Sequence, residues 1–132
     1  MIKPNRILAI INPISGVGSK SRIPELLAEA YNEREEELLI TYTKGEGHAT
    51  RLVKEAIENN IDSIIAVGGD GTINEIASAL HGSQVKMGII PKGSGNGLAR
   101  ALNLPLSSDA EAVRVITEGH TTAIDTGMVD GK

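Results

Sequence analysis

Residues 63–72 read SIIAVGGDGT, an apolar run of strand character followed at once by three glycines around one carboxylate. Helical spacing resumes at residues 74–80. Glycine in such a turn lets the backbone take positive φ and approach a ligand closely. The turn also points free backbone N–H groups and the helix dipole at one place, which suits an anion. The negative charge of Asp70 would oppose the binding of an anion by itself. Its presence therefore indicates a site that also holds a metal ion or a reacting hydroxyl.

The rest of the chain repeats this strand–loop–helix pattern. Helical apolar spacing at residues 22–32 and 49–59 alternates with short runs rich in Ile, Val and Leu, which predict strands at residues 6–11, 38–43, 63–67 and 86–90. Such alternation is typical of βαβ units, and the continuous apolar runs fit strands that are covered on both faces. The sequence predicts an α/β fold, an open, mostly parallel Rossmann-like sheet with helices on both faces.

The glycines gather after the predicted strands. Ten of the fifteen lie in four loops, at residues 12–18, 44–48, 68–72 and 92–97. Right-handed crossovers bring the carboxyl ends of parallel strands to one edge, where ligands of open α/β sheets bind. We therefore expect the four loops to converge on one crevice.

Composition excludes several classes of function. The 132 residues include no cysteine, so no disulfide or cysteine metal site is expected, and a reducing, cytoplasmic location fits. A net charge of -4 and an aromatic content of 2% argue against nucleic-acid binding, which uses basic fields and stacking platforms. No apolar run approaches the roughly 20 residues of a transmembrane helix.

Two common nucleotide motifs are absent. Residues 18–21, GSKS, lack the glycine–lysine spacing of a P-loop. Residues 93–97 read GSGNG, which is not a dinucleotide fingerprint, and the second strand ends in Thr43-Lys44 instead of an acidic residue. A Walker-type NTPase and a dehydrogenase are both disfavoured.

Some candidate residues also have an ordinary structural interpretation. Thr72 and Glu75 have the spacing of a capping box. Asp70 could be an Asx-turn residue between glycines, and His48 could cap the helix that follows it.

The end of the chain predicts a change of structure. Ser108 and Glu111 have capping-box spacing before another helix, and a strand is expected at about residues 121–129. Asp130-Gly131 is a hairpin signal without a returning strand. We expect residues 1–125 to form a nucleotide-binding α/β domain and residues 126–132 to begin a truncated, β-rich second domain.

The motifs together resemble the diacylglycerol kinase catalytic domain, which bacterial lipid kinases share with sphingosine and ceramide kinases. In chain order, the resemblance is carried by Asn12-Pro13 with Ser15-Gly16, Thr43 with Gly47-His48-Ala49, residues 68–72 with Asn74-Glu75, and Pro91 with residues 93–96 and 98–100. NAD kinases and phosphofructokinases are similar at the GGDG block alone. Gly97 departs from the Asp of many bacterial members, so the lipid acceptor stays open.

The resemblance implies an ATP-dependent lipid kinase with Mg²⁺ as its metal cofactor, acting on a diacylglycerol- or sphingoid-type lipid at a membrane surface. A homodimer is compatible with it. By analogy, the residues that contact the nucleotide are Asn12, Pro13, Ser15, Gly16, Thr43, Gly68, Gly69, Asp70, Gly71, Thr72, Asn74 and Ser94. Asp70 is the catalytic candidate, either organising the metal or accepting the hydroxyl proton. The alternatives are a nucleotide-binding module without chemistry and an NAD kinase-like enzyme. The 132-residue chain alone is expected to phosphorylate nothing.

Overall fold

A four-stranded sheet forms the centre of the structure, a computed structural model that describes residues 5–13, 22–91 and 109–117. In chain order the elements are β1 (Arg6–Ile11), α1 (Ile23–Tyr31), β2 (Glu37–Tyr42), α2 (His48–Glu58), β3 (Ser63–Gly68), α3 (Asp70–Leu80), β4 (Lys86–Pro91) and α5 (Asp109–Thr117). The four predicted strands agree with the observed ones to within one residue.

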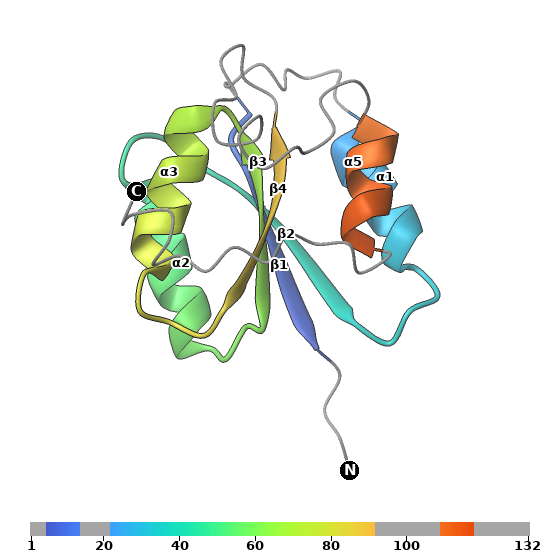
Figure 1. The fold of residues 1–132 in the computed structure, drawn as a ribbon, viewed down its shortest axis with the longest axis horizontal. Coiled ribbons are helices and arrows are strands. Elements are labelled where there is room, and N and C mark those ends of the chain that lie inside the picture. Colours follow the sequence, from blue (N-terminus) through green and yellow to red (C-terminus); the bar gives the residue numbers. More distant parts are fainter. Residues whose placement is uncertain (1–4, 14–21, 92–108, 118–132) are drawn as a thin grey trace.

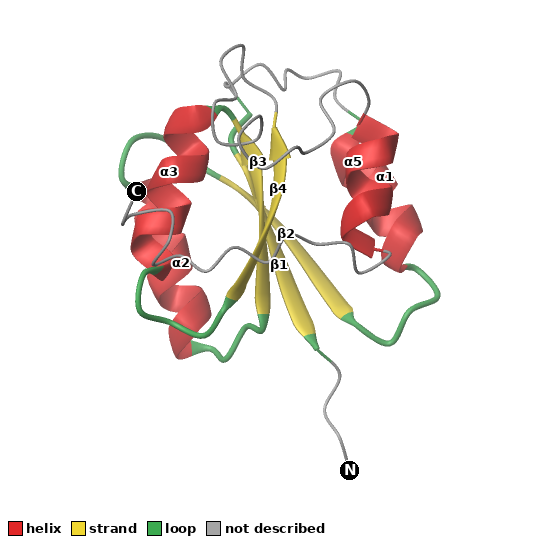
Figure 2. Cartoon of the chain, in the orientation of Figure 1, coloured by secondary structure: helices red, strands yellow, loops and turns green. Residues whose placement is uncertain are grey.

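All strand pairs are parallel, in the order β2-β1-β3-β4. Ile11 at the end of β1 pairs with Tyr42 on one side and with Val67 on the other, so the carboxyl ends of these strands share one edge (Figure 2). The chain first moves outward from β1 to β2 and then returns to add β3 on the opposite side. Ligands of open α/β sheets bind beside such a reversal, here between β1 and β3.

Helices cover both faces of the sheet, as predicted. Figure 1 shows α2 and α3 on one face and α1 and α5 on the other. Side chains alternate along β3, so that Ile64 and Ala66 pack toward α2 and α3 while Ile65 and Val67 pack toward α1 and α5. Each face has its own apolar core, and these β3 residues are at most 2% exposed. The continuous apolar runs of the sequence therefore reflect burial on two sides.

Helix α3 begins at Asp70, one turn before the predicted start at residue 74. Gly69 is its N-cap, with extended backbone at φ -87° and ψ -174°, and Gly71 lies inside the first turn. Among the described glycines only Gly47 and Gly82 have positive φ. The expectation of positive φ in the 68–72 turn is therefore wrong, because the chain passes directly from extended to helical backbone.

Several predictions fall on other parts of the chain. Ser108, the strand expected at residues 121–129 and the Asp130-Gly131 hairpin lie outside the described residues. In the part that the structure describes, no helix has both the length and the apolar character needed to span a bilayer.

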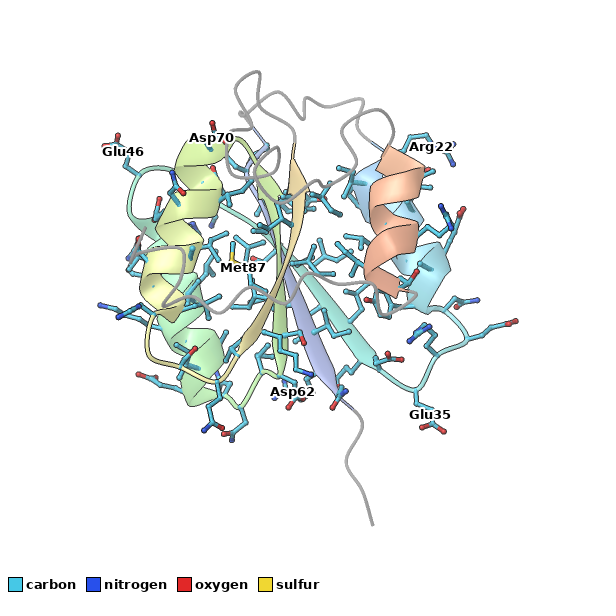
Figure 3. All side chains as sticks on the ribbon, in the orientation of Figure 1. Arg22, Glu35, Glu46, Asp62, Asp70 and Met87 are labelled. Carbon is cyan, nitrogen blue, oxygen red and sulfur yellow. The ribbon has the colours of Figure 1, made fainter. Side chains whose placement is uncertain are left out.

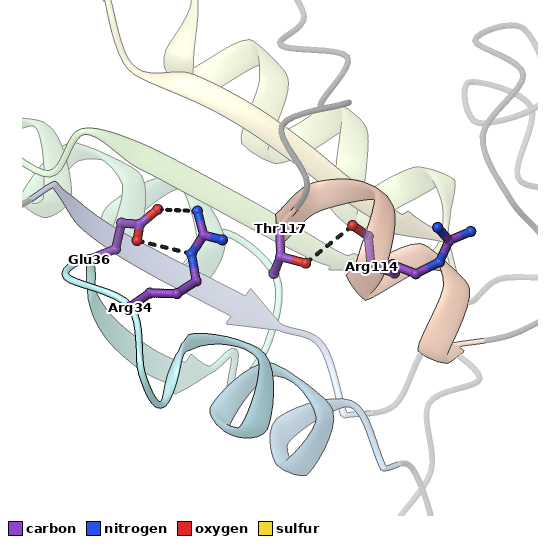
Figure 4. Close-up of polar contacts among 4 residues, drawn as sticks. All are labelled: Arg34, Glu36, Arg114 and Thr117. Carbon is purple, nitrogen blue, oxygen red and sulfur yellow. Dashed lines mark hydrogen bonds and ion pairs between the residues drawn. The ribbon is translucent and has the colours of Figure 1, made fainter.

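An ion pair closes the turn between α1 and β2. The guanidinium of Arg34 donates to both carboxylate oxygens of Glu36, with Nε–Oε1 at 3.0 Å and Nη2–Oε2 at 2.8 Å (Figure 4). The guanidinium carbon of Arg34 also lies 5.6 Å from the ring centre of Tyr31. The hydrogen bond from Arg34 lowers the pKa of Glu36, and burial raises the pKa of Tyr31.

Figure 4 also shows a hydrogen bond near the end of α5, where the Thr117 hydroxyl donates to the Arg114 carbonyl at 3.1 Å.

Replacing Glu36 by Gln should therefore lower the free energy of unfolding by an amount that depends on pH. Since the folded pKa lies below the ordinary value, the ionised pair stabilises the fold above about pH 4.5, and this contribution is lost as the pH falls through the folded pKa. We expect Glu36→Gln to lower the free energy of unfolding by about 0.5 kcal/mol at pH 7, as for exposed pairs. Denaturant titrations from pH 7 to pH 3 measure this, with Glu35→Gln as the exposed control. A cost that stays constant down to pH 3 would contradict the assignment.

Candidate functional site

A pocket of about 450 Å³ lies at the carboxyl edge of the sheet. Its lining residues come from three of the four predicted glycine loops, from the end of the predicted second strand, from the first turn of α2 and from the first two turns of α3: Asn12, Thr43, Gly45, Glu46, Ala49, Gly71, Thr72 and Glu75. In Figure 3 the labelled Asp70 and Glu46 lie at this end of the molecule, and Asp62 lies at the opposite end. The predicted crevice at one edge of the sheet is therefore confirmed for the loops that the structure describes.

Asn12 connects β1 to α3 at the point where the strand order reverses. Its backbone N–H donates to the carbonyl of Val67 at 3.0 Å, continuing the ladder to β3. Its side-chain Nδ2 donates to Oγ1 of Thr72 at 2.8 Å, across 60 positions of sequence. Asn12 therefore orients Thr72 at the base of the pocket.

Glycine occupies positions 68 and 71 of the motif for different structural reasons. A Cβ at Gly68 would lie 3.0–3.2 Å from the side chain of Thr72, which is itself only 7% exposed. A Cβ at Gly71 would meet nothing within 4 Å, and this residue lines the pocket. Packing of Thr72 thus favours glycine at position 68, because a methyl group there would push the Thr72 side chain aside by a few tenths of an ångström. The fold leaves position 71 open, which is consistent with close approach of a ligand.

Asp70 is the first residue of α3 and precedes the pocket-lining Gly71. A carboxylate in the first turn is stabilised by the helix dipole. The residue is half-buried, and its Oδ1 oxygen is buried. Because Gly69 is the N-cap and Asp70 already has helical backbone, the Asx-turn interpretation is replaced by a place inside the helix.

The loop before α2 forms the opposite wall. Thr43 is 8% exposed and donates its backbone N–H to Ile11 at 2.9 Å, which extends the β1–β2 ladder toward the pocket. His48 begins α2, and its Nδ1 accepts the backbone N–H of Lys44 at 2.9 Å. His48 therefore fastens the preceding loop, and the prediction that it caps the following helix is wrong.

Glu75 is paired with the neighbouring helix. Its Oε2 accepts from the backbone N–H of Thr50 at 2.9 Å and from the Thr50 hydroxyl at 3.0 Å. The capping box with Thr72 is wrong, since α3 has no side-chain cap and Thr72 bonds to Asn12. Sequence spacing reveals partners within one helix and misses a partner 25 positions away.

The structure brings together only part of the predicted site. Asn12, Thr43, Gly71 and Thr72 line the pocket. The other described members of the predicted site are not among the lining residues: Pro13, Gly68, Gly69, Asp70 and Asn74. Ser15, Gly16 and Ser94 lie outside the described residues. The sequence interpretation missed four lining residues as site members, Gly45, Glu46, Ala49 and Glu75. Their position after the second and third strands was the signal that could have found them.

A parallel sheet with a pocket beside its strand reversal is the arrangement in which open α/β domains bind their ligands. The sequence model of the diacylglycerol kinase catalytic domain matches residues 6–129, and the chain belongs to that family. It is 36% identical to a diacylglycerol kinase of Staphylococcus epidermidis over 96% of this chain and 40% of the relative. It is 35% identical to a protein of Serratia proteamaculans named probable lipid kinase YegS-like, over 98% of this chain and 43% of the relative.

The solved structures agree with the sequence comparison. A crystal structure of a diacylglycerol kinase from Bacillus anthracis superposes with a TM-score of 0.75 at 34% identity, over 91% of this chain and 42% of that one. The chain spans about two-fifths of the length of the relatives it matches.

The two glycines provide a matched test of the site's construction. We expect Gly68→Ala to lower the free energy of unfolding by about 1–3 kcal/mol, because its methyl group overpacks against Thr72. Gly71→Ala should leave stability unchanged or raise it by up to about 1 kcal/mol, because the helix gains a better helix former. Urea unfolding of both variants measures the difference. Equal losses would contradict the distinct roles.

Proposed function

We propose that the pocket binds the nucleotide of ATP and that the whole protein transfers its γ-phosphoryl group to a lipid hydroxyl. The observation that carries this is the open space at Gly71, in a pocket beside the first turn of α3 in a member of the diacylglycerol kinase catalytic domain family. Backbone N–H groups at such a helix start suit phosphate oxygens. The strand reversal beside Asn12 is where ligands of this fold class bind.

Phosphoryl transfer depends mainly on positioning and on stabilising charge. Asn12 orients Thr72, Thr43 extends the opposite wall, and Gly71 permits close approach of the phosphates. We assign Asp70 the catalytic position, either organising the metal or accepting the proton of the attacking hydroxyl. Pro13, Ser15, Gly16, Gly68, Gly69, Asn74 and Ser94 complete the nucleotide site in this proposal.

The residues fit Mg²⁺ as cofactor. Mg²⁺ is commonly held by one or two carboxylates together with substrate phosphates, not by a cage of protein ligands. Asp70 offers one carboxylate at the pocket end of α3, and no group of three or more His, Asp or Glu residues that could hold a metal occurs in residues 5–13, 22–91 and 109–117. When bound, the ion would neutralise phosphate charge.

The proposed acceptor is a diacylglycerol- or sphingoid-type lipid at a membrane surface, reached from the cytoplasm. The names of the relatives from Staphylococcus epidermidis and Serratia proteamaculans support a lipid acceptor. We further propose that residues 1–125 are the nucleotide domain and that residues 126–132 begin a second, β-rich domain that completes the lipid site.

Transfer of labelled γ-phosphate from ATP to diacylglycerol or sphingosine in mixed micelles tests the proposal with the full-length protein. We expect Asp70→Ala to reduce turnover by about 100-fold or more, in the range of a lost general base. Glu58→Ala, which removes an exposed carboxylate from the far end of α2, is the control. Near-normal turnover of Asp70→Ala would show that Asp70 is not functional. Phosphorylation of NAD, or MgATP binding without any lipid product, would overturn the lipid kinase assignment.

Gly71→Ala should separate binding from folding. Its methyl group would enter the pocket, so the dissociation constant for MgATP should rise by about tenfold or more while the fold stays intact. Titration calorimetry of wild type and variant measures the change. If the affinity for MgATP is unaltered, the phosphates do not bind against Gly71 and the proposed binding mode is wrong.

A further inference from the structure

The amino terminus of α2 lacks a cap from its own segment. Its N-cap is Gly47, at φ +80°, and no side chain caps it there. The first turn of α2 contains no acidic residue. The N–H of Thr50 lies in that first turn, where backbone donors have no partner within the helix. Its partner is Glu75 of α3, which also accepts the Thr50 hydroxyl.

This contact is a cap supplied by another helix. A carboxylate at a helix amino terminus is favoured both by the hydrogen bond and by the dipole. Hydrogen bonds to an ionised group are shorter and stronger than neutral ones. Both Thr50 and Glu75 are half-buried, so the bond is partly protected from water. The first turn of α2 is therefore fixed to α3 through Thr50, in addition to the bond that joins His48 to its own loop at Lys44.

The two helices supply opposite walls of the pocket. Gly45, Glu46 and Ala49 come from the loop and first turn of α2, and Gly71 and Thr72 come from α3. The two helices also share one buried apolar cluster, to which Ala49, Val53, Ile73, Ile76 and Leu80 belong. The Thr50–Glu75 pair is the polar connection at the pocket end, directly beside both walls.

We propose that Glu75 is a positioning residue: acting through Thr50, it sets the separation of the two pocket walls and so the affinity for the nucleotide. The inference rests on the proposed function, because the ligand it positions is the nucleotide. Glu75 lines the pocket, whereas Thr50 does not. Variants of Thr50 therefore separate an effect through the cap from direct contact between Glu75 and a ligand.

The test measures KM for ATP and kcat for diacylglycerol phosphorylation by the full-length protein. Glu75→Ala should raise KM about tenfold, the scale of one lost charge-assisted hydrogen bond, with a smaller change in kcat. Thr50→Val removes the hydroxyl donor but keeps its size and backbone N–H, so KM should rise about threefold. Thr50→Ser restores the hydroxyl and should return KM to near the wild-type value.

The double variant decides between coupling and independence. If Glu75 acts through Thr50, KM of Thr50→Val/Glu75→Ala should equal that of Glu75→Ala, because the shared interaction is already lost. Amide exchange at Thr50 in nucleotide-free protein should also accelerate in Glu75→Ala. If Glu75→Ala fails to fold, the comparison of KM for ATP between Thr50→Val and Thr50→Ser tests the same proposal.

Three results would overturn the proposal. They are a wild-type KM in Thr50→Val, KM effects that multiply in the double variant, and a Thr50 amide that exchanges equally fast with and without Glu75. A wild-type protein that phosphorylates no lipid and binds no ATP would instead refute the proposed function, whatever the amide exchange shows. The two failures are thus distinguishable.

Discussion

The parallel pairing of β1 with β3 is the constraint on which the rest of the structure depends. It sets both strands in the interior of the sheet, where helices cover them on two faces, and it places the reversal of strand order between them. The chain ends both strands at the same edge, so Asn12 and the turn at residues 68–70 become neighbours despite their separation in sequence. The pocket exists because those two strand ends meet there.

The sequence predicted β1 and β3 well because burial on both faces leaves a continuous apolar run, and such runs end where the chain reaches solvent. The edge strand β2 is only partly buried and was found by its apolar residues alone. It misplaced the start of α3 because glycines suggested a loop, whereas Gly69 is extended and Gly71 is helical. It also predicted local caps for Thr72, Glu75 and His48. The actual partners, Asn12, Thr50 and Lys44, are mostly set by tertiary packing that spacing along one element does not encode.

The GGDGT turn combines separate physical requirements. Gly68 makes room for Thr72, Gly69 is the N-cap of α3, and Gly71 leaves open space at the pocket. The side chain of Asn12 holds Thr72 by a hydrogen bond, and Glu75 of the same helix accepts a hydrogen bond from Thr50 of α2. A short stretch after one strand therefore contributes to both walls of the pocket.

The most direct test of the account is a crystal structure of the full-length protein with ADP and Mg²⁺. We expect the diphosphate at the carboxyl edge of the sheet, against the backbone at Gly71 and between the walls formed by the start of α2 and the start of α3. A nucleotide bound at the opposite edge, or one bound outside the pocket that Asn12, Thr43 and Thr72 line, would contradict it.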